Sequence, residues 1–182
     1  MGEWNPRMIA KALLQNTIYL LAMGALLFAS AGSLDWPAAW VFLIISAILG
    51  PVCAWWLAKT DPALRAERLR SPLQAEQPAT DKKFVIVLFA MIVVWLVAMG
   101  FDHRAQASDI PLLLQTLGLA LYLLSTAFIM WVFRENSFAV PVVKVQAARH
   151  HRASGPYAFV RHPMYSGIML FFVGVSLLLG SW

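Results

Sequence analysis

The densest group of chemistry-bearing side chains lies in the last polar segment of the chain. This segment holds His150, His151 and His162, three of the four histidines in the sequence. It passes through Arg161, His162 and Pro163 directly into an apolar stretch. Imidazole and guanidinium groups gathered in this way can bind an anion, hold a metal or move a proton. The position of the proline helps to choose among these chemistries.

Pro163 suits the first turn of a helix, because the N–H that it lacks would have no partner there. His162 is then predicted to lie at the N-cap, and the free amide groups of that turn carry a partial positive charge beside Arg161. A helix start of this kind can bind a carboxylate or a phosphate. Tyr165 is expected in the same first turn.

Glycines flank this junction on both sides. We predict that Gly155 and Pro156 form a turn that brings Tyr157 back over the site. Gly167, and Gly174 one heptad later, have no side chain and would allow a second helix or a flat ligand to approach closely.

Two other interpretations fit the same residues. A helix that enters a membrane needs an interfacial cap, in which Arg161 would bind lipid phosphate while Tyr157 and Tyr165 lie in the aromatic belt. A zinc site built from the three histidines is a weaker alternative, because no Cys, Asp or Glu neighbours them in the sequence. We therefore predict no metal.

The composition indicates which elements position the junction. The chain has 182 residues, of which 60% are hydrophobic and 13% charged, whereas a soluble domain carries about 45–50% apolar and about 25% charged residues. A soluble enzyme, a disordered chain and a disulfide scaffold are excluded. The single cysteine, Cys53, lies in an apolar run and is expected to be packed and unreactive. The sequence predicts an integral membrane protein.

Five stretches are apolar and long enough to cross the hydrocarbon as helices, which takes roughly 20 residues each. None contains an Asp, Glu, Lys or Arg, and they lie at about Ala12–Ala31, Ala38–Ala58, Phe84–Phe101, Ile110–Phe133 and Met164–Trp182. We predict one all-α membrane domain over residues 1–182, a polytopic bundle of five transmembrane helices. A small transporter is disfavoured, because ion-coupled transport needs charged groups at membrane depth.

The basic residues indicate the orientation. Every Lys and Arg except Arg104 lies before the first span or in the segments 59–83 and 134–163. Basic loops stay in the cytoplasm, so the N-terminus and both segments are predicted to be cytoplasmic, at the inner (plasma) membrane if the source is bacterial. The basic residues follow membrane sidedness and form no stripe, so no nucleic-acid partner is expected. Within the first segment, Asp61 and Pro62 are predicted to start either a short surface helix or a solvated loop.

The run from Gly155 to Gly167, GPYAFVRHPMYSG, resembles the signature of the isoprenylcysteine carboxyl methyltransferase family, which is itself similar to membrane phospholipid methyltransferases. The likeness covers most of the chain and is strong from about Glu135 onward. It implies an integral membrane enzyme that uses S-adenosylmethionine (SAM), bound in a pocket that faces the cytoplasm. No Gly-rich strand-to-helix loop of the Rossmann type is present in the sequence.

The resemblance places Tyr157, His162, Pro163, Met164 and Tyr165 in the cofactor pocket. The family also uses a His followed by apolar residues just before the turn, where this sequence reads RHHR over residues 149–152. The candidate cofactor site therefore comprises His150, His151, Arg152, Tyr157, Arg161, His162, Pro163, Met164, Tyr165 and Gly167. No catalytic residue is assigned.

The expected methyl acceptor is lipophilic and reaches the site from the bilayer, so membrane lipid is an expected partner. A prenylated cysteine carboxylate is the acceptor that the resemblance implies, and a phospholipid amine, a small thiol and an isoprenoid acid are the alternatives. In the family a further helix, with a Glu-rich motif and an Arg, returns to the cytoplasm after the last span described here. Because the sequence stops at Trp182, we expect a fragment or an incomplete relative. A non-catalytic protein that binds lipid or nucleotide stays open as an alternative.

Overall fold

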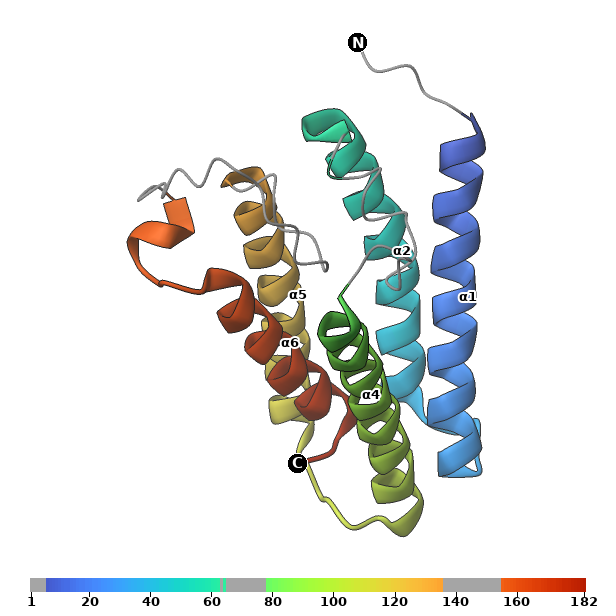
Figure 1. Cartoon of the computed structure of the whole chain (residues 1–182). Coiled ribbons are helices and arrows are strands. Elements are labelled where there is room, and N and C mark those ends of the chain that lie inside the picture. Colours follow the sequence, from blue (N-terminus) through green and yellow to red (C-terminus); the bar gives the residue numbers. More distant parts are fainter. Residues whose placement is uncertain (1–5, 63, 65–77, 136–154) are drawn as a thin grey trace.

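The computed structural model of the chain describes residues 6–62, 64, 78–135 and 155–182. The elements in these residues are helical, and no strand occurs among them. In chain order they are α1 (Pro6–Ala31), α2 (Pro37–Thr60), α4 (Ala79–Ala105), α5 (Leu112–Glu135), the 3-10 helix η1 (Gly155–Ala158) and α6 (Pro163–Leu179). The all-α helical bundle predicted from the sequence is confirmed (Figure 1).

Four of these helices, α1, α2, α4 and α5, are long and apolar enough to cross a membrane. The fifth, α6, is also apolar but has 17 residues. At 1.5 Å per residue its length is about 26 Å, slightly less than the roughly 30 Å of a hydrocarbon core. It ends before Gly180, which adopts the left-handed conformation with φ of 79°.

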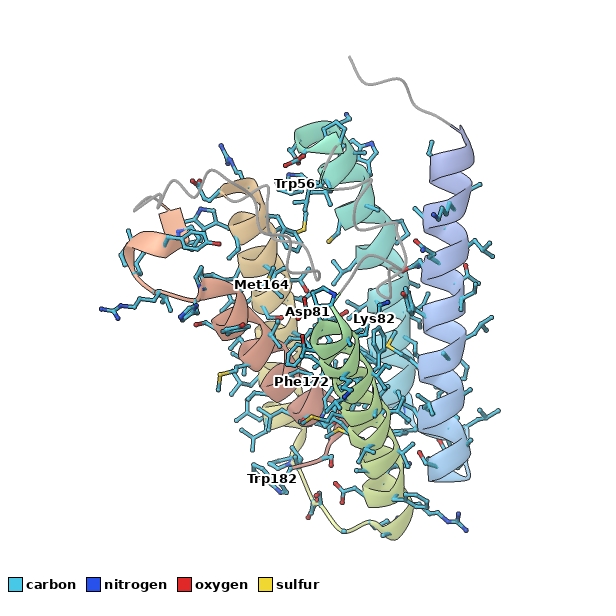
Figure 2. The ribbon with its side chains drawn as sticks, viewed as in Figure 1. Trp56, Asp81, Lys82, Met164, Phe172 and Trp182 are labelled. Atoms are coloured by element: carbon cyan, nitrogen blue, oxygen red, sulfur yellow. The ribbon has the colours of Figure 1, made fainter. Side chains whose placement is uncertain are left out.

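Helices that follow one another in the chain run in opposite directions (Figure 1). The two ends of the bundle also differ in charge. The starts of α1, α4 and α6 and the ends of α2 and α5 lie on one side, which we call the basic end after its residues Lys11, Lys59, Lys82, Lys83, Arg134 and Arg161. The other side, the acidic end, carries Asp35, Asp102, Asp109 and Arg104. Figure 2 shows Trp56, Asp81, Lys82 and Met164 toward the basic end and Trp182 toward the acidic end.

The main hydrophobic core lies toward the acidic end. Its buried side chains come from the end of α1, the start of α2, the second half of α4, the first half of α5 and the end of α6: Leu27, Ala31, Trp36, Ala39, Phe42, Leu96, Met99, Tyr122, Val175, Leu178 and Leu179. A smaller cluster at the basic end contains the buried residues Leu57, Leu64 and Phe133. Among the described residues, the larger cluster therefore lies on the side away from the junction.

The helices α5 and α6 form the most extensive helix pair, and glycines allow their backbones to meet. A Cβ atom at Gly174 would lie 2.6 Å from the amide nitrogen of Tyr122 and 3.0 Å from the carbonyl oxygen of Gly118. A Cβ at Gly118 would lie 2.7 Å from the carbonyl oxygen of Gly174. Small residues that permit such contact are typical of helix interfaces in membranes.

The outer surface of the bundle is apolar, as lipid requires. The first half of α4 shows this most clearly, because Ile86, Val87, Leu88 and Phe89 are all exposed and together cover every face of one helical turn. In water such an exposed apolar surface would promote aggregation. In hydrocarbon it has no cost, so the exposure agrees with the predicted membrane location.

Candidate functional site

The junction between the polar segment and α6 folds as its proline predicts. Pro163 is the first residue of α6 and is buried, and His162 is the N-cap residue, with φ of −130° and ψ of 66°. The carbonyl oxygen of His162 accepts hydrogen bonds from the amides of Tyr165, at 3.1 Å, and Ser166, at 3.3 Å. The predicted helix start at residue 163 is confirmed.

The same hydrogen bonds reduce the number of amide groups that an anion can use. Pro163 has no N–H, and the amides of Tyr165 and Ser166 are directed at His162. Among the described residues, the amide of Met164 has no hydrogen-bond partner. An anion at this helix start would therefore bind one first-turn amide together with the exposed guanidinium of Arg161, a smaller set of donors than the sequence predicts.

The side chains of His162 and Tyr165 lie together on the surface. Their ring centroids are 5.6 Å apart with an interplanar angle of 33°. Tyr165 is 65% exposed, and His162 is also exposed. The pair offers an open phenol face beside an imidazole, and a phenol face attracts a cationic ligand group through its quadrupole.

The turn before the junction is held against α5. Gly155 has φ of 60°, a left-handed conformation that favours glycine, and a Cβ there would lie 2.6 Å from Cγ of Glu135. Pro156 is buried, and η1 packs on α5. Tyr157, in this turn, is half-buried. The predicted turn is present and lies at the end of α5, whereas the placement of Tyr157 over the site stays a prediction.

Met164 connects the junction to the rest of the basic end. It packs against the smaller cluster, which is formed by Leu57 of α2, Leu64 and Phe133 of α5. Leu64 is held in place by its own amide, which donates to Oδ1 of Asp61 at 2.9 Å. Residues that lie far apart in the sequence are thus brought together beneath the start of α6.

A pocket of about 270 Å³ opens beside this cluster. It lies between the ends of α2 and α5 and is lined by Thr60, Asp61, Phe133 and Arg134. Phe133 belongs to both the pocket and the cluster that contacts Met164. Sequence reasoning did not single out these four residues as a site. The available signal was that each lies where an apolar span meets a polar segment.

The structure brings together part of the predicted site. Arg161, His162, Pro163, Met164 and Tyr165 are consecutive at the start of α6, and η1 carries Tyr157 next to α5. His150, His151 and Arg152 lie outside the described residues.

Gly167 faces a helix. A Cβ there would lie 2.7 Å from Cγ1 of Ile129 and 3.2 Å from Cδ1 of Phe128, both on α5. The fourth histidine of the chain, His103, stacks on Trp36 near the acidic end, with ring centroids 4.4 Å apart. Within the part of the chain that the structure describes, no group of three His, Cys, Asp or Glu side chains could hold a metal.

Residues 113–182 match a family model described as phospholipid methyltransferase (PEMT). The match supports a membrane methyltransferase. It spans α5, η1 and α6, and so contains the whole junction and the helix pair that positions it. It supports the phospholipid and isoprenylcysteine methyltransferase kind in general and does not select the isoprenylcysteine enzymes. Searches of curated proteins and of solved structures found no match to the chain.

Proposed function

We propose that this protein is an integral membrane methyltransferase that uses SAM and acts on a lipophilic acceptor at the basic end of the bundle. The observation that carries the proposal is the exposed His162–Tyr165 pair at the start of α6, inside the segment that matches the methyltransferase family model. One face of α6 is buried against α5, including Gly167, Gly174 and Val175, whereas the junction presents its polar groups on the surface.

The chemical groups at the junction fit the charged parts of SAM. The amide of Met164, which has no hydrogen-bond partner within the described part of the chain, and the exposed guanidinium of Arg161 suit its carboxylate, since both donate to an anion at a helix start. The exposed ring of Tyr165 suits its sulfonium, because an aromatic face attracts a cation. His162 borders the same surface, and its ring can pack on or hydrogen-bond to the ligand.

When bound, SAM supplies a methyl group that its sulfonium activates for transfer. A carboxylate acceptor is already ionised at neutral pH, so the chain would need no general base. Its residues would align the two reactants and exclude water. An amine or thiol acceptor has a proton to lose, and a ring nitrogen of His162 is the group at this junction that would accept it.

For the methyl acceptor, we propose more specifically the carboxylate of a prenylated cysteine. It rests on the resemblance of the GPY and RHPMY residues, and the apolar outer surface of the bundle is compatible with an acceptor that arrives through the bilayer. The description of the matching family model keeps a phospholipid amine as the alternative. The two acceptors give products that differ chemically, because a methyl ester is split by alkali and an N-methyl group is not.

The experiment uses membranes that contain the full chain and SAM labelled in its methyl group. Label that alkali releases as methanol would support a carboxylate acceptor, whereas alkali-stable label in phospholipid would support the amine. SAM binding measured by calorimetry without any methyl incorporation would favour the non-catalytic alternative. The absence of both binding and incorporation would refute the proposal.

Two variants locate the site. We expect His162→Ala and Tyr165→Ala to lower SAM affinity at least about tenfold, which corresponds to about 1.4 kcal/mol. Tyr19→Ala is the matched control, since Tyr19 is also exposed, at 52%, but lies on α1. Unchanged affinity in both junction variants would contradict the assignment even if the protein binds SAM elsewhere.

A further inference from the structure

The turn that leads into α6 exposes an apolar pair. Phe159 is 83% exposed, more than any other large hydrophobic residue that the structure describes, and Val160 beside it is 39% exposed. Both belong to the connection between η1 and α6. Their amides donate to the carbonyl oxygen of Pro156, at 3.2 Å and 3.1 Å. The backbone of this turn is therefore fixed while its apolar side chains remain uncovered.

The length of α6 indicates the depth at which this pair lies. The helix of 17 residues spans about 26 Å, a few ångströms less than a hydrocarbon core of about 30 Å. At its other end Trp182 is 75% exposed, as expected of an aromatic anchor at a membrane interface. A short helix anchored there places the residues just before Pro163 at the opposite interface, within reach of the acyl boundary.

The basic residues at this end of the bundle also fit a lipid surface. Lys59, Arg134 and Arg161 are exposed at the same end of the bundle, and Nζ of Lys59 lies 4.1 Å from the ring centroid of Trp55. Anionic lipids of a cytoplasmic leaflet attract basic residues near the surface. An exposed Phe at the same end of a bundle as exposed cations is typical of protein segments that lie in the interface.

We infer that the turn at residues 159–160 inserts into the lipid leaflet at the basic end and anchors the start of α6 at headgroup depth. The partner is the lipid surface itself. The anchor would hold the His162–Tyr165 pair, which follows within six residues, at the boundary between water and lipid. The inference does not depend on methyl transfer, because it concerns the position of the turn and not its ligand.

Spin labels provide the test, because Cys53 is the single native cysteine. The full chain carrying Cys53→Ala would be labelled at Phe159→Cys or at Val160→Cys and placed in lipid nanodiscs. Electron paramagnetic resonance would measure the access of oxygen, which concentrates in hydrocarbon, and of a water-soluble nickel chelate. Ala107→Cys, at an exposed loop position, and Val94→Cys, at a site 67% exposed on α4, provide the aqueous and hydrocarbon references.

We expect the label at residue 159 to show severalfold lower nickel access than the label at residue 107, with oxygen access between the two references. The label at residue 160 should behave in the same way. Nickel access equal to that of residue 107 would overturn the inference, because the turn would then lie in water. Low access to both reagents would also overturn it, since protein and not lipid would then cover the turn. None of these outcomes depends on SAM binding or on catalysis, so failure here and failure of the proposed function are separate results.

Discussion

At the scale of single residues, the exposure of Tyr165 separates a role in binding from a role in stability. An aromatic residue in a first helical turn can pack into a core or face a ligand, and this one is 65% exposed. Removal of an exposed side chain without buried contacts changes stability by about 0.5 kcal/mol or less. Tyr165→Ala should therefore leave the thermal unfolding midpoint in detergent unchanged while SAM affinity falls. A large drop in the midpoint would show that the phenol is a structural group.

Gly155 differs from Tyr165, because its role is to permit a backbone conformation and not to contact a ligand. A Cβ at this position meets two penalties: the left-handed backbone, which costs about 1–2 kcal/mol for a residue other than glycine, and contact with the side chain of Glu135. We expect Gly155→Ala to displace η1 and to weaken SAM binding, as measured by calorimetry.

A double variant tests how much of the loss of SAM binding in Gly155→Ala comes from contact with Glu135. Glu135→Ala removes the side chain that the new Cβ would contact, so Gly155→Ala combined with Glu135→Ala should recover part of the loss and no more. Full recovery would mean that the backbone conformation carries no cost. The absence of any recovery would mean that contact with Glu135 is irrelevant.

At the scale of elements, the crossing of α5 and α6 determines where the junction lies. A Cβ added at Gly174 would have backbone atoms of α5 as its nearest neighbours, at 2.6–3.0 Å, and these atoms cannot rotate away. Gly174→Ala should separate the two helices and destabilise the protein by about 1–3 kcal/mol, the usual range for overpacking. Thermal unfolding in detergent micelles measures this loss, and SAM affinity should fall with it because the proposed site lies at the start of α6.

Gly24→Ala is the matched control for this substitution. A Cβ at Gly24 of α1 meets a single side-chain atom, Cδ1 of Leu43, at 3.4 Å. The substitution should be neutral or should stabilise α1 by up to about 1 kcal/mol through helix propensity. Equal destabilisation by the two variants would show that the close crossing at Gly174 is not the cause.

The sequence predicts the existence of these helices better than it predicts where they begin and end, and the reasons are physical. Hydrocarbon thickness requires long apolar runs, so the spans are evident, and the chemistry of Pro163 indicates where α6 begins. The ends are less evident: α4 begins at Ala79 and so includes Asp81, Lys82 and Lys83, because a helix continues into the headgroup region once it has formed.

Tertiary contacts could not be predicted in the same way. Gly174 was compatible with either a helix or a flat ligand, and the structure places a helix there. Met164 packs against the cluster of Leu57, Leu64 and Phe133, which brings together distant parts of the sequence. The spans are apolar on all faces, so their pattern does not indicate which side is buried. For the same reason, sequence reasoning missed the pocket residues Thr60 and Phe133.

At the scale of the whole molecule, the two ends of the bundle differ in the size of their hydrophobic clusters. This difference separates the part that stabilises the fold from the part that could bind a ligand. The larger core lies toward the acidic end, and the smaller cluster lies beside the junction and the pocket. Regions with fewer buried apolar contacts open more readily than a packed core. As far as the described residues go, a ligand that enters between the helix ends at the basic end would meet the smaller of the two clusters.

The separation of charge between the ends leads to the prediction of orientation. Lys83 and the other described basic residues lie at one end, except for Arg104. Positive segments stay on the cytoplasmic side during insertion. SAM is made in the cytoplasm, so a site at the basic end is accessible to this cofactor only in the same orientation. The charge pattern and the proposed chemistry thus predict the same topology, with the N-terminus inside.

Single cysteines test this topology independently of activity. In a Cys53→Ala background, Ala107→Cys at the acidic end and Lys83→Cys at the basic end are both at exposed positions. A maleimide that cannot cross membranes should label residue 107 in intact cells and residue 83 only after the cells are permeabilised. The permeabilised sample serves as the control for intrinsic reactivity, since both positions should then react. Labelling of residue 83 in intact cells would place the junction outside and, because SAM would then be absent from its side, would also exclude the proposed function.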